Sequence, residues 1–180
     1  MEHENFAALV APHTAAMARV PAALVGIADA EDAAQEALLR AWRGWPSLRD
    51  ADAIHTWLLR ITVNVCRNWQ AGHFGASRRH NAPLDLAAHL ATAANHSNDI
   101  GDADTLDLRQ AVVALPNELR RVVALRFYAG MDSTQIGAVL DTPAATIRTR
   151  LRRALELLRR DLDDSEKHAS PSPREGIKNG

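Results

Sequence analysis

Arginine and threonine side chains crowd one short stretch of this sequence, and their chemistry suits the recognition of phosphates and base edges. A guanidinium offers forked donors that match phosphate oxygens and the edge of guanine. On a helix of 100° per residue, Ile147 and four leucines share one face while the arginines point the other way. The first turns of this helix supply Ala145, Thr146, Arg148, Thr149 and Arg152 for contact with DNA. A solvated basic face on an ordinary amphipathic helix remains the alternative at this point.

The elements around this stretch predict a helix-turn-helix. Asp132 and Gln135 have the spacing of a capping box at the start of a short helix. The sequence Asp141-Thr142-Pro143 then predicts a cap followed by proline at the first position of a long helix, which ends near Leu162. This arrangement of a short helix, a tight turn and a long basic helix is a helix-turn-helix, and its second helix enters the major groove of DNA.

A second group of polar residues lies on a helix expected from Ala30 to about Trp45, with Asp29 as its N-cap. Asp32, Gln35 and Glu36 share one face of that helix at i, i+3 and i+4. By itself such a face is more often solvated surface than a docking site. A further helix is expected from His55 to Gln70, with the core-facing residues Trp57, Leu58, Ile61, Val65 and Trp69.

The sequence shows none of the common residue patterns of catalytic sites. The single cysteine, Cys66, sits in an apolar helix and is interpreted as a buried thiol. The eight histidines show no HExxH spacing, and neither a glycine-rich phosphate loop nor a GxSxG motif is present. We therefore expect no enzyme activity, no catalytic residue, no metal and no cofactor.

Charge is distributed unevenly along the 180 residues, although the whole chain has a net charge of −1. Residues 1–72 carry 6 basic and 8 acidic side chains, whereas residues 106–162 carry 10 basic and 6 acidic ones. The near-zero total therefore hides a basic segment. The longest stretch without a charged side chain, Asn5 to Ala18, is shorter than the ~20 apolar residues of a membrane span. With no secretory signal pattern either, we expect a soluble, cytoplasmic protein without membrane insertion.

The predicted fold class is all-α, with two small helical domains joined by a flexible linker. The first domain covers residues 1–72, and Pro12 and Pro21 are expected to bound or kink its first helices. Residues 73–105 form the linker, with one weak helix at Leu84–Leu90. Residues 106–162 form a four-helix domain that contains the helix-turn-helix, and residues 163–180 a disordered tail.

Three blocks of the sequence resemble the sigma-70 family of bacterial RNA polymerase initiation factors, and more narrowly its small extracytoplasmic-function (ECF) group. DAEDAAQEALLRAWRGW at 29–45 is similar to region 2.2, and HTWLLRITVNVCRNW at 55–69 to regions 2.3 and 2.4. The stretch from Ala114 to Leu162 is similar to region 4. Each block alone is moderately specific, but three in this order are highly specific.

The resemblance implies a role for each group of residues. Asp32, Gln35 and Glu36 would dock on core RNA polymerase, which reverses the preference for a solvated face. The loop from Leu48 to His55 would capture a base flipped from the minus-10 element, and the helix after it would hold the upstream edge of that element. The expected minus-10 residues are Leu48, Arg49, Asp50, Ile54, His55, Thr56, Trp57, Arg60, Asn64 and Arg67. The residues of the arginine-rich helix that would read the minus-35 element are Thr146, Arg148, Thr149, Arg150, Arg152 and Arg153.

The resemblance thus implies a sigma factor that directs promoter-specific initiation with core polymerase and promoter DNA, held inactive by an anti-sigma factor. The loop departs from this pattern, because Asp50 and Asp52 do not suit a close approach to phosphate. Two alternatives are an autonomous helix-turn-helix regulator and a sigma-like decoy that binds a regulator. The docking face and loop within residues 29–69 argue against the first, and the intact arginine series argues against the second.

Overall fold

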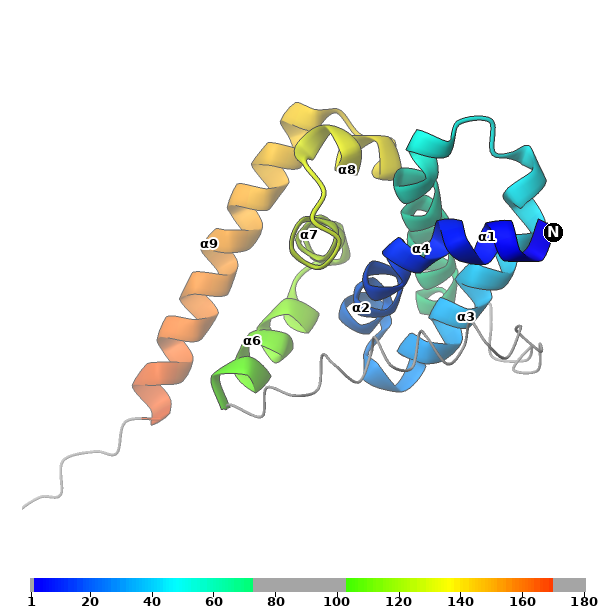
Figure 1. The fold of residues 1–180 in the computed structure, drawn as a ribbon. Coiled ribbons are helices and arrows are strands. Elements are labelled where there is room, and N and C mark those ends of the chain that lie inside the picture. Colours follow the sequence, from blue (N-terminus) through cyan, green and yellow to red (C-terminus); the bar gives the residue numbers. More distant parts are fainter. Residues whose placement is uncertain (1, 73–102, 170–180) are drawn as a thin grey trace, which may run out of the picture.

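The structure, a computed structural model, describes residues 2–72 and 103–169, and all regular elements within those ranges are helical (Figure 1). This confirms the all-α prediction. The expected weak helix at Leu84–Leu90, like most of the expected linker, lies outside the described residues.

Within residues 2–72, the first segment contains four α-helices and three short 3₁₀ turns. The elements are α1 (Glu2–Val10), η1 (Ala11–His13), α2 (Thr14–Val25), α3 (Ile27–Gly44), η2 (Trp45–Ser47), η3 (Ala51–Ala53) and α4 (Ile54–Gln70). Helices α2, α3 and α4 pack against one another. Pro12 lies in the 3₁₀ turn η1 and so separates α1 from α2, as expected. Pro21 instead lies inside α2, which continues to Val25.

Helix α3 starts earlier than predicted. Its N-cap is Gly26, whose φ of 88° lets the chain turn sharply out of α2, and the helix begins at Ile27 rather than Ala30. Asp29 is therefore not the cap. It lies in the first helical turn, where its carboxylate still interacts favourably with the helix dipole.

The second segment consists of α6 (Ala103–Ala114), α7 (Asn117–Val123), the π-helical turn η4 (Ala124–Tyr128), α8 (Ser133–Leu140) and α9 (Ala144–Ala169). Helix α9 continues past the predicted end at Leu162, so the predicted disordered tail is wrong over residues 163–169. The reason is that no helix breaker follows Leu162 until Pro171, and a proline disfavours helix at the residue before it.

The two segments share one apolar core, which the sequence did not predict. Residues of the first segment, such as Met17 and Leu58, belong to the same buried cluster as Leu125, Ile136 and Ile147 of the second. Helix α2 contacts α3 and α4 of the first segment and α6, α7 and η4 of the second. Helix α4 of the first segment also contacts α8 of the second. A smaller cluster, including Val112 and Leu158, joins α6, α7 and α9.

One stretch, Phe6–Val25, is long and apolar enough to cross a membrane by length and composition alone. In the structure it is divided among α1, η1 and α2. Phe6, Val10, Met17 and Val20 are at most 2% exposed, and Phe6 packs edge-on against Trp42. Its large apolar side chains therefore belong to the core of the described structure.

The turn between α8 and α9 depends on a glycine. As predicted, Asp132 and Gln135 form a complete capping box at the start of α8. At the other end, Asp141 adopts a left-handed conformation with φ of 49°, and Thr142 N–H donates to Gly137 O at 3.0 Å. A Cβ at Gly137 would lie 2.5 Å from Thr142 O, so no side chain fits there. Pro143 precedes α9 rather than occupying its first turn, and the Thr142 hydroxyl donates back to Leu140 O instead of capping α9.

Gly137→Ala is expected to lower the free energy of unfolding by about 1–3 kcal/mol, because the added methyl group overpacks the turn. Urea unfolding followed by circular dichroism measures this change. Thr134→Ala, at an exposed position on the same helix, serves as the control and should shift stability by no more than about 0.5 kcal/mol. Equal free energies of unfolding for the two variants would mean that the turn accommodates the added methyl group without loss of stability.

Candidate nucleic-acid interface

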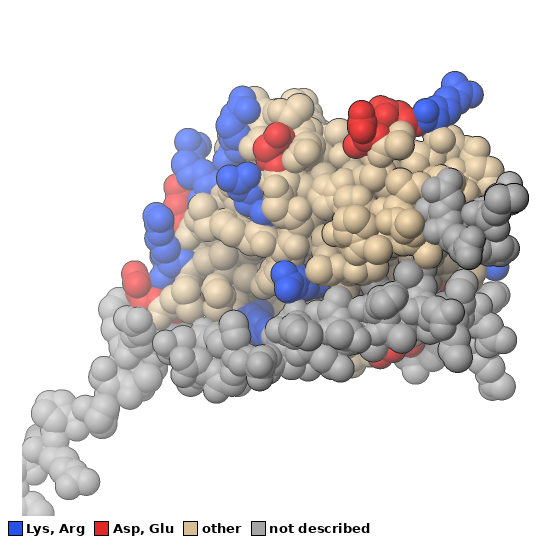
Figure 2. Space-filling model, viewed as in Figure 1, with Lys and Arg blue, Asp and Glu red and all other residues tan. Residues whose placement is uncertain are grey.

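Helix α9 presents the predicted basic face to solvent. Ile147, Ala154 and Leu158 are buried on its inner side. Thr146, Arg148, Thr149, Arg152 and Arg153 are all exposed on the outer side, with Arg159 and Arg160 further along. Figure 2 shows basic side chains gathered along the edge of the molecule where α9 lies. This face can supply guanidinium donors to phosphates and base edges.

Arg150 differs from the other predicted minus-35 residues. Its Nη2 lies 2.9 Å from Glu118 Oε2 on α7, and its side chain is only 30% exposed. The carboxylate thus holds this guanidinium against the body of the segment, and Arg150 orients α9 on α7 in this conformation. By contrast, Arg152 makes only a marginal ion pair with Glu156 at 4.0 Å, so it keeps its donors available.

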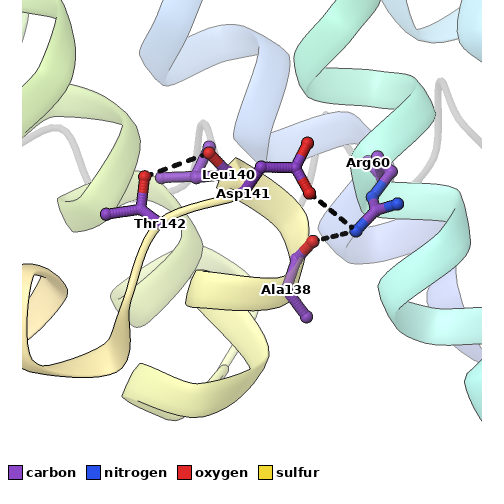
Figure 3. Close-up of polar contacts among 5 residues, drawn as sticks. All are labelled: Arg60, Ala138, Leu140, Asp141 and Thr142. Atoms are coloured by element: carbon purple, nitrogen blue, oxygen red, sulfur yellow. Dashed lines mark hydrogen bonds and ion pairs between the residues drawn. The ribbon is translucent and has the colours of Figure 1, made fainter.

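The predicted minus-10 residues on α4 divide into exposed and occupied ones. Ile54 is 7% exposed and joins the core, so its role in this conformation is packing rather than contact with DNA. Arg67 is exposed, and Thr56, Trp57 and Asn64 are half-buried. Arg60 is exposed as well, but its Nη2 donates to Ala138 O and lies 3.3 Å from Asp141 Oδ1, as Figure 3 shows.

His55 also bonds to the second segment. Its Nε2 lies 3.2 Å from Ala129 O, and because a carbonyl only accepts, Nε2 must carry the proton. In the neutral ring Nδ1 then accepts from His13 Nδ1–H at 3.0 Å. Burial first, and then the proximity of His55, lower the pKa of His13, which favours the neutral form of the His13 ring.

The loop before α4 exposes charged side chains. Arg49 and Asp50 are exposed, while Leu48 is half-buried against the core. The Asp50 carboxylate accepts a hydrogen bond from Asp52 N–H at 2.9 Å. That bond holds η3 in place and reduces the capacity of this carboxylate to accept from a base edge.

On α3 the predicted docking residues are exposed to different degrees. Asp32 is exposed, whereas Gln35 donates to Glu31 at 3.2 Å and Glu36 accepts from Arg40 at 2.7 Å. Glu36 would have to exchange Arg40 for a basic group of a partner. Of the two carboxylates in this set, Asp32 would therefore break fewer intramolecular contacts on binding a partner.

Cys66 has the properties of a packing residue. It is 1% exposed, and burial raises the pKa of its thiol to about 12. A thiol with such a pKa is protonated at neutral pH and is a poor nucleophile. Among the described residues no group of three or more His, Cys, Asp or Glu side chains could hold a metal ion.

Sequence reasoning missed the partners of several site residues, namely Glu118, Asp141, His13 and the carbonyl groups of Ala129 and Ala138. Asp141 carried a signal, because an aspartate just before Thr-Pro was expected to form a cap. Its pairing with Arg60 depends on how two helices that are far apart in the sequence pack together. The hydrophobic periodicity of each helix does not predict that packing.

Two family models match this chain. Sigma-70 region 2 matches residues 13–73, and Sigma-70, region 4 matches residues 105–158. The chain is 30% identical over 166 residues to the ECF RNA polymerase sigma-E factor of Escherichia coli (strain K12), covering 87% of this chain and 86% of that protein. It is 29% identical over 141 residues to the RNA polymerase sigma-H factor of Pseudomonas aeruginosa, covering 72% and 71% respectively.

Two solved structures share the fold. One is CnrH in complex with the cytosolic domain of CnrY, with a TM-score of 0.61, 23% identity and coverage of 93% of this chain and 91% of that one. The other is the sigma factor RpoE in complex with the anti-sigma factor NepR from Bartonella quintana, with a TM-score of 0.65, 21% identity and coverage of 89% and 96%.

Arg148→Ala and Arg152→Ala are each expected to weaken binding of the polymerase complex to promoter DNA by ~1–3 kcal/mol if the arginine makes a good base contact. The loss should appear with the preferred minus-35 sequence and shrink when that sequence is scrambled. Fluorescence anisotropy with both DNAs measures the difference. Arg160→Ala removes the same charge from the same helix and should weaken both DNAs equally. Unchanged sequence preference in Arg148→Ala and Arg152→Ala would mean that other residues recognise the minus-35 sequence.

Proposed function

Because the chain belongs to the sigma-70 family, in its extracytoplasmic-function group, we propose that its two segments divide promoter recognition between them. The chain directs promoter-specific transcription initiation together with core RNA polymerase. In this proposal it carries no catalysis of its own and acts in the cytoplasm, where it positions the polymerase and helps to open the duplex.

The second segment reads the minus-35 element through α9. The support is the exposed face formed by Thr146, Arg148, Thr149, Arg152 and Arg153, on a helix held by a complete helix-turn-helix. Residues at the start of such a helix reach base edges, whereas arginines further along meet phosphates. Arg150 contributes by fixing the orientation of α9 through Glu118.

The first segment binds core polymerase through α3 and the minus-10 element through the loop and α4. Asp32 and Glu36 offer carboxylates, and Gln35 an amide, to a basic partner. Arg49 in the loop and Arg60 and Arg67 on α4 provide donors for the DNA backbone. Capture of a flipped base in the loop would expose edges that are hidden while the base is stacked.

The proposal also includes a second protein that binds this chain and inhibits it. The solved relatives are described as complexes with the cytosolic domain of CnrY and with the anti-sigma factor NepR. We infer that this chain also binds an anti-sigma factor, which holds it inactive.

The observation that carries the function is the presence of both region 2 and region 4 in the expected order in one chain. An autonomous repressor would not need the region 2 segment, and a decoy would not need the exposed arginines of α9. Run-off transcription with core polymerase tests the function directly. The chain should co-purify with core polymerase and start transcripts at one position on a cognate promoter. Failure of both would refute the proposal.

Asp32→Arg is expected to weaken association with core polymerase by about tenfold or more, because it replaces an exposed carboxylate with a cation facing a basic partner. The helical circular dichroism signal should not change. Asp52→Arg makes the same charge change at an exposed position on η3 and should bind core polymerase normally. Loss of helical signal in Asp32→Arg would instead identify this residue as structural.

A further inference from the structure

We propose that His13 and His55 together bind one divalent transition-metal ion of the Ni²⁺ or Cu²⁺ type, which joins η1 to the start of α4. The two residues are 42 positions apart in the sequence, and their Nδ1 atoms lie 3.0 Å apart. The sequence predicted no metal site, because these histidines have no motif spacing and meet only in the folded chain. Metal binding here does not depend on the proposed function.

A hydrogen bond to a carbonyl group fixes the tautomer of His55. Its Nε2–H donates to Ala129 O at 3.2 Å, which leaves a lone pair on Nδ1, the atom that faces His13. A histidine that binds a metal through one ring nitrogen almost always donates its other N–H to an acceptor of this kind. His55 therefore has the tautomer and the hydrogen bond of a metal ligand.

His13 can present a second lone pair toward the same point. In the hydrogen-bonded pair its Nδ1–H donates to His55 Nδ1. When the metal binds, that proton leaves Nδ1 and the ring takes the other neutral tautomer, with its proton on Nε2. Burial and the proximity of His55 lower the pKa of His13, so the neutral ring is favoured. Neutral imidazole is the form that binds metals.

The separation of the two nitrogen atoms selects the class of metal. With metal–nitrogen bonds of about 2.0–2.1 Å, the separation of 3.0 Å gives an angle of about 95° at the metal. Neighbouring ligands make an angle near this value in square-planar and octahedral complexes, which suit Cu²⁺ and Ni²⁺. Tetrahedral Zn²⁺ would need the nitrogen atoms about 3.3–3.4 Å apart. The pair therefore fits Ni²⁺ and Cu²⁺ better than Zn²⁺ without movement of either ring.

Water completes the coordination. Both histidine side chains are half-buried, so the pair is in contact with solvent. Among the described residues no third His, Cys, Asp or Glu side chain joins them. With two protein ligands, binding is weaker than in a structural site with four.

The helix dipoles oppose a cation at this position, but only weakly. His13 directly precedes α2 and His55 lies in the first turn of α4, and both helix ends carry a partial positive charge. Each dipole lowers the affinity for a cation by about fivefold or less. Loss of a group that merely orients a ligand typically lowers metal affinity by about 10–100-fold. Two direct imidazole ligands therefore outweigh the dipoles.

Isothermal titration of the full chain with NiCl₂ tests the site. His13→Ala and His55→Ala should each weaken Ni²⁺ binding at least tenfold, while the helical circular dichroism signal stays the same. His89→Ala, which removes a histidine outside the pair, is the matched control and should bind like the native chain. Equal affinity in all four proteins would overturn the proposal. Tighter binding of ZnCl₂ than of NiCl₂ would contradict the assigned class of metal.

Paramagnetic broadening in the native chain tests the same site without any substitution. Substoichiometric CuCl₂ should broaden the imidazole NMR signals of His13 and His55, and the amide signals of Thr14 and Thr56, before those of other residues. Broadening that begins at another histidine would overturn the proposal. Broadening without selectivity would mean that the two rings form a hydrogen-bonded pair only, which would also overturn it.

Thermal unfolding shows whether the metal joins η1 to α4. Saturating NiCl₂ should raise the melting temperature of the native chain and of His89→Ala, because the metal binds the folded pair more tightly than the unfolded chain. It should not raise the melting temperature of His13→Ala. The same shift in all three proteins would show that the metal acts elsewhere and would overturn the proposal.

Discussion

The structure depends on the burial of α2 from two sides. This helix is apolar around most of its circumference and carries Arg19 as its one charged residue. A helix of that kind needs more covering than one neighbouring pair of helices provides. Helices α3 and α4 cover one side, and α6, α7 and η4 cover the other. Two segments that are each too small for a large core therefore complete one core between them.

Joint burial also explains why several carbonyl groups at the contact accept hydrogen bonds from side chains. Leu24 O, at the end of α2, would lack an intrahelical partner and receives donors from Gln70 and Arg120 instead. Ala129 O and Ala138 O lie at corresponding ends of η4 and α8, and receive donors from His55 and Arg60. Arg120, His55 and Arg60 thus each donate to a carbonyl group near a helix end of the other segment, whereas Gln70 donates to Leu24 O from the same segment.

Local features were predictable from the sequence because they depend on neighbouring residues. The capping box of Asp132 and Gln135, the buried thiol of Cys66 and the exposed arginine face of α9 all follow from spacing within one element. The start of α3 was misplaced because a cap-forming aspartate competed with a glycine, and the positive φ of Gly26 decided the turn. Docking of the segments was not predictable, since periodicity reports that a face is apolar but not what covers it.

The abundance of arginine has two separate causes, and only the structure distinguishes them. Arg60, Arg120 and Arg126 donate to backbone carbonyl groups, and Arg150 pairs with Glu118. A planar guanidinium suits such sites because its fork reaches several acceptors at once. In this conformation the donors of these arginines are engaged within the protein, although they add to the positive charge of the sequence. The outer face of α9 and, in the first segment, Arg49 and Arg67 keep exposed guanidinium groups. The nucleic-acid interface is therefore defined by where the exposed arginines lie and not by how many the chain contains.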